Sequence, residues 1–129
     1  MANAIFGTER LYFTRPTDDD LETVRTLVRH ATIMEFQGGA MNDMQSEAFI
    51  AYVRDHWRKF GFGHFIARLR VDDRFVGVFS LKHLSVDTKA GGMPDLGYFL
   101  KPELWGQGLA TEGARGLVDY GLKVLGLRG

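Results

Sequence analysis

Two glycines, Gly106 and Gly108, stand where an apolar strand is predicted to turn into the start of a helix, and their type and spacing suit anion binding. The first N–H groups of a helix have no acceptor within it, and that end carries about half a positive charge. Glycine has no Cβ, so the backbone can approach a diphosphate closely. The segment 100–112 is therefore predicted to be a cradle for phosphate groups.

Two common phosphate loops do not fit this segment. The Walker loop ends in Gly-Lys-Ser/Thr, whereas Leu109 follows Gly108. The dinucleotide-binding loop requires a third glycine three positions after Gly108, where Thr111 stands. The pattern excludes both motifs at this junction.

The loop resembles the acetyl-CoA loop of the GNAT superfamily, Arg/Gln-x-x-Gly-x-Gly/Ala. Residues 105–110 match it, with Trp105 at the position of the Arg or Gln. The longer string Trp-Gly-Gln-Gly-Leu-Ala-Thr-Glu-Gly-Ala is similar to the branch of ribosomal-protein and related N-acetyltransferases. That resemblance extends over the whole chain, through residues 8–11, 60–63 and 95–99.

The resemblance implies that acetyl-CoA is the acetyl donor. Backbone amides from Gly106 to Thr111 would hold the pyrophosphate. The main chain of β-strand residues Tyr98, Phe99 and Leu100 would pair with pantetheine and polarise the thioester carbonyl, as an oxyanion hole does. The implied cofactor-binding residues are Tyr98, Phe99, Leu100, Trp105, Gly106, Gln107, Gly108, Leu109, Ala110 and Thr111.

Direct attack by an amine requires a group that accepts its proton. Asp95, on the strand beside the cofactor, is the candidate, because relatives often carry an acidic residue there. The alternative is a strand-start carboxylate that meets solvent or Lys101. Glu112 lies in the first helical turn, where its interaction with the helix dipole explains it without a catalytic role.

The first half of the chain is predicted to contain one strand and two helices. A strand at 11–15 ends at a proline, and Thr17 is a plausible N-cap for a helix that reaches about His30. The segment 33–44 is irregular and is predicted to be a mobile loop that selects the amine. A second helix places aromatic residues at core spacing over 49–60, including Trp57 and Phe60.

The remaining elements are three strands and a helix. Alternation over 64–70 predicts a strand with one solvated polar face, paired as a hairpin with the apolar strand 75–81. A third strand at 95–100 leads through the glycine loop into a helix with a core-facing stripe over 114–125. The order β-α-α-β-β-β-α predicts an α/β (α+β) fold with helices on a mostly antiparallel sheet. The resemblance implies the GNAT acyl-CoA N-acyltransferase fold.

Residues 1–129 are expected to form one domain that is incomplete at its C-terminal end. GNAT members continue with another strand, a helix and a final strand. Without them, the strand at 96–100 would be an unpaired edge, so a homodimer through that edge is predicted. Two functions stay open: an N-acetyltransferase acting on a protein N-terminus or a small-molecule amine, and a non-catalytic CoA-binding or dimeric interaction module.

The composition of the chain argues against several classes of function. Sixteen basic and sixteen acidic residues give no positive field for nucleic acid or anionic membrane. The chain has no cysteine, which excludes a thiol nucleophile, and its start has no signal-like segment, so a cytoplasmic protein is expected. The four histidines lack metal-binding spacing, so no metal site is expected, and they are interpreted as surface or helix-cap residues.

Overall fold

One antiparallel sheet of five strands, in the order β1-β2-β3-β4-β5, organises the chain in a computed structural model that describes residues 4–35, 37–83, 94–124 and 126. The strands are β1 (Phe6–Gly7), β2 (Leu11–Thr14), β3 (His64–Leu69), β4 (Phe75–His83) and β5 (Pro94–Leu100). The helices are α1 (Asp18–Val28), α2 (Asp43–Phe60) and α3 (Leu109–Lys123), and a short 3-10 turn, η1 (Pro102–Leu104), precedes α3.

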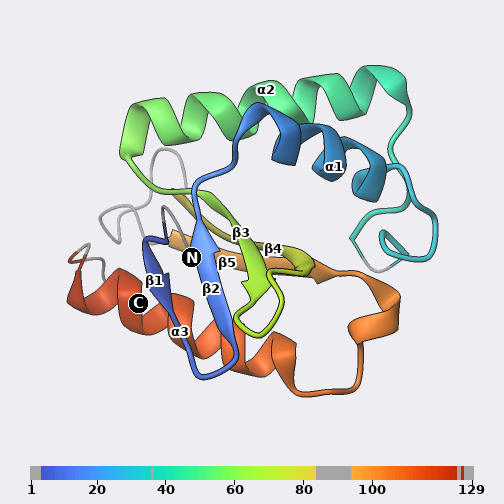
Figure 1. Ribbon diagram of the computed structural model, residues 1–129. Helices are drawn as coiled ribbons and strands as arrows, with labels where there is room; N and C mark the ends of the chain where they lie inside the picture. Colours follow the sequence, from blue (N-terminus) through green and yellow to red (C-terminus); the bar gives the residue numbers. More distant parts are fainter. Residues whose placement is uncertain (1–3, 36, 84–93, 125, 127–129) are drawn as a thin grey trace.

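The helices lie on both faces of the sheet, with α1 and α2 side by side on one face and α3 on the other (Figure 1). This arrangement confirms the predicted antiparallel sheet flanked by helices. No helix in the described ranges is both long and apolar enough to cross a lipid bilayer.

Strand β1 was not predicted, because two residues are too short for an alternating pattern. It pairs with β2, where Phe6 lies opposite Phe13. The Phe6 ring stacks on Phe13 with centroids 4.4 Å apart and on Tyr120 of α3 at 4.6 Å. The strand therefore ties the start of the chain to α3.

The first helix begins as the sequence predicts, and the second begins earlier. Thr17 caps α1 through a capping box with Asp20. The second helix starts at Asp43, where Asn42 accepts a hydrogen bond of 2.8 Å from the Gln45 N–H. This first turn has no aromatic residue and its one apolar residue, Met44, is exposed, so the aromatic pattern could not reveal it.

The prediction that one face of β3 is solvated is wrong, because α1 and α2 cover that face. Arg68 on that face binds Asp20 of α1 at 2.8 Å. His64 is only 4% exposed, and its carbonyl accepts a hydrogen bond of 2.8 Å from the Trp57 indole. The core position of Trp57 is confirmed by its 6% exposure. A polar residue at every second position of a strand does not show whether that face of the sheet meets solvent or is covered by helices.

Two of the histidines, which were expected at the surface or at helix caps, are buried. His56 is 4% exposed, as His64 is, and its Nδ1 lies 2.7 Å from the Phe62 carbonyl oxygen. Burial alone would raise the pKa of Asp20, but hydrogen bonds from Arg68 and Thr17 hold that pKa below its ordinary value. The layer between α1, α2 and the sheet thus contains paired polar groups within an apolar core.

Candidate functional site

The predicted glycine loop connects β5, which lies at the edge of the sheet formed by the described residues, to α3, and it has the backbone shape that its glycines allow. Gly106 and Gly108 have φ angles of +78° and +77°. Residues that have a Cβ atom rarely adopt this left-handed region of backbone angles. The local sequence therefore permits a turn that would be strained with most other residues.

The start of α3 presents backbone donors as predicted. Its N-cap is Gly108, which has no capping side chain. The Glu112 N–H makes a 3.0 Å bond to the Gly108 carbonyl, so the amides of residues 109–111 precede the intrahelical bonds. These amides are the donors that could hold a diphosphate. Their contact with a cofactor stays a prediction.

A cavity of about 710 Å³ adjoins these amides, which is within the usual range for ligand sites. It brings the loop together with β5 and with Ile33 and Gln37 from the irregular segment. Its lining is Ile33, Gln37, Gly97, Tyr98, Leu100, Leu104, Trp105, Gly106, Gly108, Leu109, Ala110 and Thr111. Nine of the ten predicted cofactor-binding residues lie in the loop or line this cavity; Phe99 does neither.

The alternation of β5 explains why Phe99 differs. The Lys101 N–H donates to the Val76 carbonyl of β4 at 3.0 Å. Backbone groups of Phe99, two positions earlier, therefore face β4, whereas those of Tyr98 and Leu100 face the open edge. This geometry disagrees with the prediction that the Phe99 main chain pairs with pantetheine, and for Tyr98 and Leu100 the pairing stays a prediction.

The carbonyls on the open edge already accept hydrogen bonds from side chains. The Gln37 amide donates to the Tyr98 carbonyl at 3.1 Å. The Trp105 indole donates to the Leu100 carbonyl at 3.0 Å. The N–H groups of Tyr98 and Leu100 are thus the donors that this edge presents to a ligand carbonyl.

The proposed proton acceptor is not tested by the geometry. Asp95 belongs to β5, where it lies opposite Lys82, but its side chain is outside the described residues. Within the described ranges, no group of three or more histidine, aspartate or glutamate side chains is placed to hold a metal ion.

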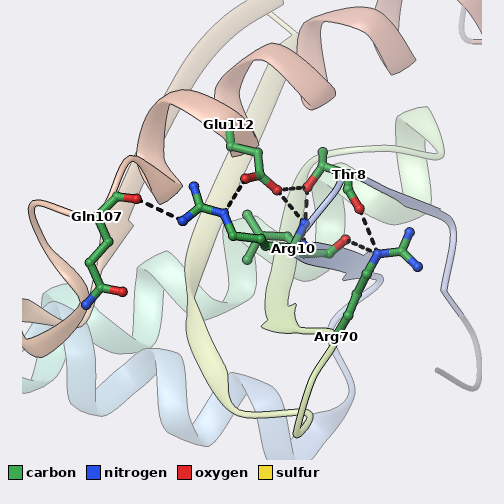
Figure 2. A network of polar contacts seen from close by, with 6 residues as sticks. Thr8, Arg10, Arg70, Gln107 and Glu112 are labelled. Carbon is green, nitrogen blue, oxygen red and sulfur yellow. Dashed lines mark hydrogen bonds and ion pairs between the residues drawn. The ribbon is translucent and has the colours of Figure 1, made fainter.

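Glu112 has partners that the sequence did not reveal. Its carboxylate accepts hydrogen bonds from the Thr8 hydroxyl at 2.5 Å, the Arg10 N–H at 2.7 Å and Arg10 Nε at 2.7 Å (Figure 2). Burial alone would raise the pKa of Glu112, but these bonds hold that pKa below its ordinary value. Arg10 Nη1 also donates to the Gln107 carbonyl at 2.9 Å. Arg10 is therefore part of the loop's surroundings, although about a hundred residues separate them.

The chain is similar to known acetyltransferases. Residues 10–129 match the family model described as "Acetyltransferase (GNAT) domain". The acetyltransferase from Agrobacterium tumefaciens str. C58 has a TM-score of 0.81 and 22% identity, over 95% of this chain and 68% of that chain. Spermidine N-acetyltransferase from Vibrio cholerae, solved with CoA and spermine, has a TM-score of 0.72 and 16% identity, over 92% and 67%.

An aminoglycoside acetyltransferase solved with coenzyme A gives a TM-score of 0.73 and 18% identity, over 91% of this chain and 70% of that chain. Identities at this level show a shared fold. The predicted acyl-CoA N-acyltransferase fold is thereby confirmed, and the chain spans about two thirds of the length of each of these structures.

Proposed function

The chain belongs to the GNAT acetyltransferase family, and we propose that it transfers the acetyl group of acetyl-CoA to a primary amine by direct attack. One observation carries this proposal: the amides that begin α3 and the open edge of β5 border the same cavity. A diphosphate at the amides would place the pantetheine arm along β5.

The chemistry follows from the donors on that edge. The amine nitrogen attacks the thioester carbonyl carbon, the carbon–nitrogen bond forms, and the carbon–sulfur bond breaks. The N–H groups of Tyr98 and Leu100 are two residues apart on one strand, roughly 7 Å, so one of them would stabilise negative charge on the carbonyl oxygen and the other would bond to the pantetheine arm. The amine loses a proton and the departing thiolate gains one. Asp95 is proposed as the acceptor of the amine proton.

The substrate is proposed to be a protein N-terminus or a small-molecule amine such as a polyamine or an aminoglycoside. Relatives with this fold are named for spermidine and for aminoglycosides. The irregular segment between α1 and α2 contributes Ile33 and Gln37 to the cavity, so it is positioned to influence which amine enters.

An amine screen tests the proposal. The chain is mixed with acetyl-CoA and one amine at a time: a peptide with a free N-terminal serine, spermidine or an aminoglycoside. We expect thiol release and an acetylated product with one of them, because the donor and the amine can meet at the β5 edge. The same peptide with a blocked N-terminus is the matched control. Acetyl-CoA binding without product from any amine would favour the non-catalytic CoA-binding alternative.

We also propose that the chain forms a homodimer through β5. This strand pairs with β4 on one side and lies at the edge of the described sheet. A second copy would pair with the N–H groups of Tyr98 and Leu100 and would replace the Gln37 and Trp105 bonds to their carbonyls, so this dimer would form only while no acetyl-CoA occupies the edge.

Sedimentation velocity over a range of concentrations tests this assembly. We expect a dimer for the unmodified chain and a monomer for Tyr98→Pro, because proline removes an N–H that faces the open edge. Tyr98→Ala removes the ring but keeps the N–H, and it should remain dimeric. A monomeric unmodified chain would contradict the proposal.

A further inference from the structure

Arg10 lies in the turn between β1 and β2, and its side chain reaches the glycine loop that precedes α3 (Figure 2). Its Nη1 donates to the Gln107 carbonyl at 2.9 Å. Its Nη2 is 3.5 Å from the point where a Cβ on Gly108 would stand. The guanidinium group therefore touches the loop at the peptide that joins Gln107 to Gly108.

The guanidinium is held in place by the carboxylate of Glu112. One oxygen binds Arg10 Nε at 2.7 Å, and the other binds the Arg10 N–H at 2.7 Å and the Thr8 hydroxyl at 2.5 Å. Arg70 supports the turn from its other side, because its Nε donates to the carbonyls of Thr8 and Leu11 at 2.7 and 3.1 Å. These bonds fix both the backbone and the side chain of Arg10.

The peptide that Arg10 holds lies in a segment flanked by two glycines. Glycine at 106 and at 108 leaves the backbone on both sides of Gln107 with wide conformational freedom. In a trans peptide the carbonyl and the following N–H point in opposite directions, and no described peptide is cis. Holding the Gln107 carbonyl therefore directs the Gly108 N–H away from Arg10.

We propose that Arg10 is a positioning residue of the acetyl-CoA loop, which sets the direction of the Gly108 N–H for the diphosphate through its bond to the Gln107 carbonyl. This inference rests on the proposed function, since it assigns the diphosphate to the loop. Arg10 acts on the diphosphate end of the donor and not on the acetyl group. Its loss should weaken donor binding without changing contacts made by the pantetheine arm.

The test is a titration of ¹⁵N-labelled protein with CoA, and separately with pantetheine, which lacks the diphosphate. Arg10→Ala should weaken CoA binding by about tenfold, the effect expected from losing one charge-assisted hydrogen bond. Pantetheine binding should not change. The Gly108 amide resonance should shift in the ligand-free variant. Arg58→Ala is the matched control, because it removes an exposed arginine that pairs with Asp55 on α2.

Arg10→Lys separates positioning from charge. Lysine keeps the positive charge but has no planar fork to bind Glu112 and the Gln107 carbonyl together, so it should not restore CoA binding. Full restoration by lysine, or equal weakening of CoA and pantetheine, would overturn the inference. An unmodified chain that binds neither ligand would instead refute the proposed function. In that case an unshifted Gly108 resonance in Arg10→Ala would still overturn the positioning role.

Discussion

Gly108→Trp is expected to weaken CoA binding at least about 100-fold, the equivalent of two or more lost charge-assisted hydrogen bonds. Gly108 has a φ of +77°, which tryptophan can adopt only with strain. A relaxed backbone would move the amides that begin α3, and the indole would crowd Arg10, whose Nη2 lies 3.5 Å from the would-be Cβ of residue 108. Isothermal titration calorimetry with acetyl-CoA measures the loss.

Gly61→Trp is the matched control for this substitution. Gly61 ends α2 with a φ of +74°, and no atom lies within 4 Å of its would-be Cβ. Both variants should therefore lose about 1–2 kcal/mol of stability from backbone strain. Only Gly108→Trp should lose affinity for acetyl-CoA. Equal acetyl-CoA affinity in the two variants would show that the glycine loop does not hold the diphosphate.

Gly113→Val is expected to lower the stability of the fold by about 3 kcal/mol and the melting temperature by about 10 °C. Gly113 lies on the face of α3 that packs on β4, and a Cβ there would collide with the ring of Phe79. That ring is 0% exposed, and it also packs against the rings of Phe13 and Tyr98. Thermal unfolding followed by circular dichroism measures the change.

Two further variants test whether contact with Phe79 causes the loss of stability in Gly113→Val. Arg115→Val introduces the same side chain on the exposed side of α3, and it should cost only about 0.5 kcal/mol through helix propensity. Phe79→Leu makes room beside Gly113, so the double variant should lose less stability than the sum of the single changes. Additive losses would contradict close packing of α3 on the sheet as the reason for the glycine.

Short-range patterns predicted much of the molecule. The helix that starts after Thr17 has its predicted cap, since a capping side chain and its amide partner are three residues apart. The loop around Gly106 and Gly108 has the predicted left-handed turns, because only glycine adopts them readily. The predicted apolar strands formed, and the resemblance in the loop named a family that residues 10–129 match.

Other expectations failed where distant segments decide the outcome. The face of β3 that carries His64 and Arg68 is covered by two helices, and Asp20 of α1 supplies the partner charge. A polar residue at every second position of a strand is compatible with solvent or with a buried partner. The sequence pattern does not distinguish them, because the partner lies 48 residues away.

The sequence by itself therefore determined the family, the glycine loop and the donors at the start of α3, since each depends on residues close together in the chain. Only the tertiary structure decided which backbone groups of β5 face the open edge, because that depends on pairing with β4. It also decided that Arg10 and Glu112 meet beside the loop. Their hydrogen bonds join segments 102 residues apart, and no local pattern in the chain specifies such a contact.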